Sequence, residues 1–95
     1  MVLPNALTFL GTSAFRGTAI SSVTFPGTLK NIGSYAFYRC SNLSGTLIIP
    51  EGVVSIGKAA FTNTGIEKLE LADSVQTISA GAFSTCAKLT SVQIG

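Results

Sequence analysis

The chain has 95 residues, of which 46% are hydrophobic and 11% are charged, a composition that suits one domain with a buried core. Its net charge of +2 comes from six basic and four acidic residues scattered along the chain, so the sequence lacks the basic stripe of a nucleic-acid-binding protein. The longest unbroken hydrophobic run, from Tyr35 to Tyr38, is far shorter than the roughly 18 residues of a membrane-spanning helix. We therefore expect neither a nucleic-acid partner nor insertion into a membrane.

One six-residue motif recurs four times: an apolar residue, Gly or Ser, two variable residues, Ala and Phe. The copies end at Phe15, Phe37, Phe61 and Phe83, at separations of 22, 24 and 22 residues. A period of this length is typical of a solenoid of stacked coils. The motif predicts one solenoid domain over residues 1–95, with repeats at 4–25, 26–49, 50–71 and 72–94. Residues 1–10 already follow the repeat and have no basic segment, so we do not interpret them as a signal peptide.

Each repeat begins at a proline, or at Ala72 in the fourth copy, passes through the motif and ends in a short alternating segment. These segments are residues 23–25, 47–49, 69–71 and 92–94, and the first and third residues of each are apolar, as in a strand with one buried face. Stacked in register, they predict a short parallel β-sheet on one face of the solenoid. We expect turns or short helical turns around the Ala-Phe pairs on the other face. The second repeat is two residues longer than the first, and we expect a bulge near Gly45 to absorb the difference.

The pattern that runs from Cys40 to Phe61 is Cys-x-x-Leu, a strand, and then Pro-x-x-Val-x-x-Ile-Gly-x-x-Ala-Phe. It resembles the leucine-rich repeats of the BspA-like class, and the resemblance covers residues 1–95. The resemblance implies a leucine-rich repeat solenoid that forms part of a longer array. It also implies a place in cell-surface proteins of host-associated bacteria and protists, with adhesion or protein binding as the usual role.

The residues that could support catalysis are few. The chain has no histidine, which removes the commonest general base near neutral pH and the commonest metal ligand. Cys40 and Cys86 occupy equivalent positions two coils apart, so their Cα atoms should be about 9.6 Å apart, beyond the roughly 7 Å limit for a disulfide. We predict two buried free thiols, no metal site, no cofactor and no enzymatic activity. Glu67 and Glu70 could approach another carboxylate as an acid/base pair, but we interpret them as solvated surface groups.

The first candidate binding surface is the outward face of the predicted sheet, which leucine-rich solenoids generally use for recognition. Stacking of the four strand segments places two rows of side chains on that face. The rows are Ser22, Thr46, Lys68, Ser91 and Thr24, Ile48, Glu70, Gln93. They could contact a protein or a glycan, or they could be an ordinary solvated sheet surface.

A second candidate patch lies on the turns of the first two coils. It consists of Arg16, Tyr35, Tyr38 and Arg39. Tyrosine and arginine are enriched at interface hot spots, which favours a binding role. The alternative is that the two rings simply cover neighbouring turns.

The two ends of the solenoid suggest a third possibility. Residues 1–3 stand where a strand should precede Pro4, and the chain stops directly after the strand ending at Ile94, without the polar caps that solenoids need. Phe9 adds apolar surface to the first coil, where the other copies have Asn31, Ser55 and Thr77. The chain is then either a fragment of a longer array or a unit that assembles end to end into homo-oligomers. Our preferred interpretation is a non-enzymatic protein-binding module of a larger surface protein; the alternative is a self-assembling structural segment.

Overall fold

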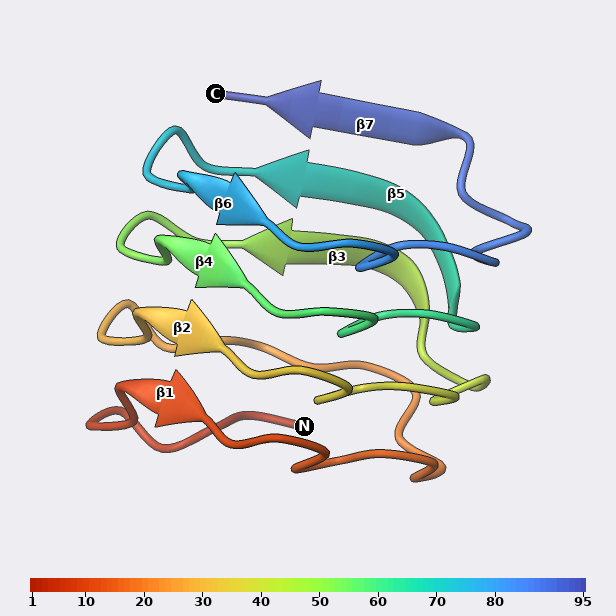
Figure 1. Ribbon diagram of the computed structural model, residues 1–95, viewed down its shortest axis with the longest axis horizontal. Helices are drawn as coiled ribbons and strands as arrows, with labels where there is room; N and C mark the ends of the chain where they lie inside the picture. The colour runs from red at the N-terminus through yellow and green to blue at the C-terminus, as the bar shows by residue number, and fades with distance from the viewer.

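The computed structural model describes residues 1–95 and shows four coils stacked along one axis (Figure 1). The chain contains strands and turns but no helix, so it has no segment of the helical length and apolarity that crossing a membrane requires. The predicted solenoid of four coils is confirmed. Of the two alternatives for the segments around the Ala-Phe pairs, the structure has turns.

Four two-residue strands form one parallel sheet along the solenoid. They are β1 (Phe9–Leu10), β2 (Asn31–Ile32), β4 (Ser55–Ile56) and β6 (Thr77–Ile78), in that spatial order. The second residue of each strand faces the core, and the first three of these residues are buried. The sequence did not predict this sheet, because a strand of two residues has no alternation to recognise.

The predicted sheet is formed by β3 (Ser44–Ile49), β5 (Gly65–Leu71) and β7 (Ser91–Ile94), which are all parallel. Leu47, Leu69 and Val92 align across it. The bulge expected near Gly45 is confirmed, since the register shifts between Gly45 and Thr46.

The predicted strand at residues 23–25 is wrong. No strand forms there, and Thr24 makes only an isolated bridge to Val2. Ser44 still donates a backbone hydrogen bond to Ser21 in the coil below, at 3.2 Å. Beyond it, Gly45 adopts a left-handed φ of 75° at the bulge, and no further ladder forms with the segment below. The sheet therefore has three strands, and its first strand leaves a hollow against residues 22–25.

The core is built around four phenylalanine rings that stack along the solenoid axis. Phe15 and Phe37 have ring centroids 5.4 Å apart, Phe37 and Phe61 5.1 Å, and Phe61 and Phe83 5.2 Å. We call this column of rings the phenylalanine stack. Phe37 and Phe61 are fully buried, whereas the two end rings are half-buried because each has a neighbouring coil on one side only.

In the second and third copies, the glycine of the repeated motif packs closely against the coil below. A Cβ on Gly33 would lie 2.5 Å from the backbone oxygen of Leu10, and one on Gly57 would lie 2.5 Å from the backbone nitrogen of Ser34. The left-handed conformation occurs instead two residues before and two residues after each phenylalanine of the stack. In the second coil these positions are Tyr35 and Arg39, each with φ 59°.

The last strand is less buried than its sequence predicts. Val92 and Ile94 keep the register of the buried residues on β5, but they are 53% and 73% exposed. In the structure no coil packs over β7. The side chains of Val92 and Ile94 therefore remain exposed, although they align with buried residues of β5. Cys86 is half-buried for the same reason, which corrects the expectation of two buried thiols, whereas Cys40 is fully buried.

Candidate binding surfaces

The outer face of the three-stranded sheet carries six of the eight residues predicted for it. Its register places Thr46, Lys68 and Ser91 in one row and Ile48, Glu70 and Gln93 in the next. Ser22 and Thr24 lie outside the sheet, across the hollow from β3. The rows therefore begin one coil later than the sequence predicts.

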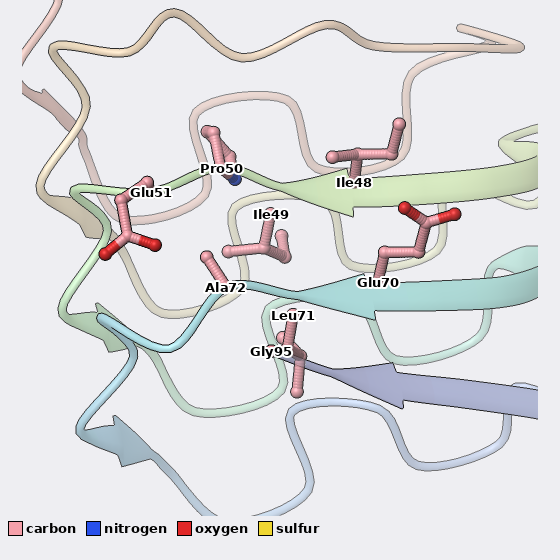
Figure 2. A pocket seen from close by; sticks show the side chains of 8 residues that line it. All are labelled: Ile48, Ile49, Pro50, Glu51, Glu70, Leu71, Ala72 and Gly95. Atoms are coloured by element: carbon pink, nitrogen blue, oxygen red, sulfur yellow. The ribbon is translucent and has the colours of Figure 1, made fainter.

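Two hollows flank Ile48 on this face. The first has a volume of about 250 Å³ and separates residues 22–25 from β3. Its lining consists of Ser22, Val23, Thr24, Phe25, Thr46, Ile48 and Pro50. The second has a volume of about 200 Å³ and lies at the ends of the sheet strands (Figure 2). Its lining consists of Ile48, Ile49, Pro50, Glu51, Glu70, Leu71, Ala72 and Gly95.

Ile48 belongs to both hollows and is 55% exposed, although the other large side chains near it on β3, Leu47 and Ile49, are buried. Figure 2 shows Ile48 and Glu70 on neighbouring strands, with Glu51 on the turn that follows β3. The exposed apolar side chain thus stands between an uncharged hollow and one bordered by two carboxylates. Such a surface can bury an apolar group of a partner and pair with polar groups around it.

The second candidate patch comes together as a compact cluster. The Cζ atom of Arg16 lies 4.8 Å from the ring centroid of Tyr38 and 5.4 Å from that of Tyr35. The Cζ atom of Arg39 lies 5.5 Å from the ring centroid of Tyr38. The two tyrosine rings meet edge to face, with centroids 5.2 Å apart. We call these four residues the Arg-Tyr cluster.

The cysteines act as hydrogen-bond donors in the core. Cys40 donates its thiol to the backbone oxygen of Phe15 at 3.0 Å, and Cys86 donates to that of Phe61 at 3.1 Å. Thr18 and Thr64 contact these sulfur atoms from the coil below at 3.5 and 3.4 Å. Both thiols are free, and each forms a hydrogen bond to the coil below its own. No three His, Cys, Asp or Glu side chains are grouped so that they could hold a metal ion.

Sequence reasoning missed some residues of the outer face. Val2 bridges to Thr24 and is 77% exposed, so it stands beside Thr24 on the far side of the hollow from β3. Its position two residues before Pro4, like that of Ile48 before Pro50, was the available signal. Pro50 and Glu51 line the hollows because the turn after β3 lies beside the outer face, and no local pattern predicts this.

Comparison with known proteins places this architecture in a family. A model of the BspA-type leucine-rich repeat region matches residues 1–95 with six copies. A search of curated proteins finds no match. Among solved structures, a leucine-rich repeat protein from Eubacterium ventriosum ATCC 27560 superposes with a TM-score of 0.71 at 20% sequence identity. The match covers 99% of this chain and 31% of that protein, so the chain spans less than a third of the length of that relative. With the whole sequence matched by the repeat model, the chain belongs to the BspA-type leucine-rich repeat family.

Proposed function

We propose that this chain is a non-enzymatic protein-binding module, of the adhesion type, within a larger cell-surface protein. The outer face of β3, β5 and β7 is its contact surface. The observation that carries the proposal is Ile48, an apolar side chain that is 55% exposed between two hollows on an otherwise polar face. The repeat family supports a role in protein interaction.

The chemistry of this face suits a protein partner. Covering the exposed part of a side chain such as Ile48 contributes favourably, because full burial of an isoleucine is worth about 1.5–3 kcal/mol. Thr46, Lys68 and Glu70 surround it with hydroxyl, ammonium and carboxylate groups from neighbouring positions of the sheet. An apolar centre with a polar rim is the usual arrangement of an interface hot spot.

The test compares wild-type protein with Ile48→Thr and Lys68→Glu on panels of immobilised proteins and oligosaccharides, by biolayer interferometry. Lys88→Glu is the matched control, since Lys88 is an exposed lysine in the fourth coil outside the outer face. We expect binding to a protein that Ile48→Thr and Lys68→Glu each weaken at least tenfold and that Lys88→Glu preserves. Equal binding by all four proteins, or binding to oligosaccharides alone, would contradict the proposal.

End-to-end assembly is a second candidate function, and the exposed apolar side chains of the end coils favour it. Phe9 is 62% exposed on the first coil, and Val92 and Ile94 are exposed on the last. As an edge strand, β7 also offers unpaired backbone groups to another strand. Light scattering across a dilution series should show mass that increases with concentration and that Ile94→Lys reduces, whereas Ile48→Thr leaves it unchanged. A constant monomer mass would eliminate this candidate.

A further inference from the structure

We propose that the Arg-Tyr cluster is a second binding surface, which takes an acidic segment of a partner protein in extended conformation. The cluster is carried by the turns that follow β1 and β2. In Figure 1 these turns lie across the coil from β3, β5 and β7. The surface is therefore distinct from the outer face and from the function proposed for it.

The Arg-Tyr cluster lies in the half of the sequence that contains no acidic residue. Residues 1–50 contain three basic residues and no Asp or Glu, whereas all four acidic residues occur in 51–95. None of the four turns, at residues 11–18, 33–40, 57–64 and 79–86, contains an acidic residue. These turns carry Arg16, Arg39 and Lys58 as their only charged residues. The turn face thus presents positive charge alone and attracts an anionic partner.

The aromatic rings hold the guanidinium groups in place. Arg16 lies over both tyrosine rings and Arg39 lies over one of them, at Cζ-to-centroid distances of 4.8 to 5.5 Å. Stacking on a ring restricts a guanidinium but leaves the N–H groups at its edge free to donate. A planar guanidinium held in this way matches a carboxylate, which can accept two parallel hydrogen bonds from it.

The backbone beneath the cluster is in an uncommon conformation for large residues. Tyr35 and Arg39 both have φ 59°, in the left-handed region. The equivalent positions of the other coils hold small or short side chains: Ser13, Ala59 and Gly81 in one column, and Gly17, Asn63 and Thr85 in the other. Bulky residues in such conformations concentrate at binding sites, where function offsets the strain. The second coil thus differs from the others in the size of the side chains at these positions and not in its backbone conformation.

The spacing of the two guanidinium groups is compatible with an extended ligand. Both Cζ atoms lie within 5.5 Å of the Tyr38 ring centroid, so they are less than about 11 Å apart. Alternate side chains of an extended peptide point to the same side and are about 7 Å apart. A segment with acidic residues at alternate positions can therefore place one carboxylate on each guanidinium.

Fluorescence anisotropy with labelled peptides tests the proposal. The probe is a fluorescein-labelled peptide that contains Glu-Ser-Glu, and the control peptide contains Gln-Ser-Gln. The protein variants are Arg16→Gln, Arg39→Gln, Arg16→Lys and the matched control Lys30→Gln, which removes an exposed positive charge from the second coil outside the cluster. Thermal unfolding of each variant verifies the fold. Arg16 and Arg39 are both exposed, so if one glutamine variant does not fold, the other still tests the proposal.

We expect the Glu-Ser-Glu peptide to bind wild-type protein at least tenfold more tightly than either glutamine variant, and the Gln-Ser-Gln peptide not to bind. Arg16→Lys should weaken binding at least threefold because it keeps the charge but loses the planar fork, and Lys30→Gln should stay within twofold of wild type. The proposal is overturned by absent wild-type binding, by equal losses in Lys30→Gln and Arg16→Gln, or by Arg16→Lys matching wild type. Tighter binding of heparin than of the peptide, with the same sensitivity to the variants, would overturn it in favour of a sulfated glycan. Ile48→Thr should leave peptide binding unchanged. This variant therefore distinguishes a failure of the present proposal from a failure of the function proposed for the outer face.

Discussion

The rings of Phe37 and Phe61 lie almost parallel, with centroids 5.1 Å apart and an interplanar angle of 6°. This separation is close to the roughly 4.8 Å spacing of parallel strands, so the rings repeat with the coils. Phe25 packs edge-on against both rings, at centroid distances of 5.8 and 6.4 Å. Each of the two central rings is thus enclosed by coils above and below and by an aromatic edge at its side.

Truncating the phenylalanine stack at its centre should destabilise the fold strongly. We expect Phe61→Ala to lower the free energy of unfolding by roughly 3–5 kcal/mol, as for other buried aromatic residues, and Phe83→Ala to cost less because its ring is half-buried. Urea denaturation measures both values, and Phe61→Leu gives a milder variant if the alanine variant does not fold. A loss under about 1 kcal/mol for Phe61→Ala would show that the central ring is not enclosed as described.

The period of the sequence predicts the coils, the phenylalanine stack and the register of β3, β5 and β7, because each depends on a residue that recurs in every copy. It does not predict the sheet of β1, β2, β4 and β6, since two-residue strands are recognisable only once coils are stacked. Nor does it predict that residues 23–25 remain outside the sheet. Their alternation matches that of residues 47–49 and 69–71, so the local pattern does not distinguish them from the paired segments.

The candidate surfaces, too, are predicted by the repeat only in part. Alternation along each strand predicts that Ile48 faces outward, but the hollows beside it arise from the gap below β3 and from the turn after it. The repeat places Arg16 one coil below Tyr38. The placement of its guanidinium over two rings depends on side-chain rotamers that no periodic pattern determines.

Adding a methyl group at the motif glycine should disturb the contact between coils. A Cβ on Gly33 would lie 2.5 Å from the oxygen of Leu10, which also accepts a 2.9 Å hydrogen bond from the Gly33 N–H. We expect Gly33→Ala to cost about 1–3 kcal/mol in urea denaturation, because the coils must separate to admit the new atom. The matched control is Gly11→Ala, since a Cβ on Gly11 would have no atom within 4 Å. This control should be neutral or stabilising by up to about 1 kcal/mol, and an equal loss in both variants would refute the packing argument.

The two thiols should differ sharply in reactivity. Cys40 is fully buried and Cys86 half-buried, although both donate a hydrogen bond to a backbone oxygen. Titration with a thiol-specific reagent should modify one cysteine in the native protein and both in denaturant, and peptide mass mapping should assign the native reaction to Cys86. Cys86→Ser should abolish the native reaction, whereas Cys40→Ser should leave it. Equal native rates for the two cysteines would mean that the turns around Cys40 open readily.

Glycine should stabilise the turns at the position two residues before each phenylalanine, where Gly81 already stands. Ala59 has φ 54°, and the left-handed conformation costs an L-residue about 1–2 kcal/mol. Glycine removes this strain but loses about 0.5–1 kcal/mol more backbone entropy on folding, so Ala59→Gly should gain about 0.5–1 kcal/mol. Ala60→Gly is the matched control, because Ala60 is fully buried and lacks a positive φ. Ala60→Gly should lose about 1–2 kcal/mol through the missing methyl group and the added backbone entropy.

Thermal unfolding resolves the difference between the two variants, since 1 kcal/mol shifts the Tm of a domain of this size by about 4–8 °C. A decrease in Tm for Ala59→Gly would show that the left-handed turn carries no strain for glycine to relieve.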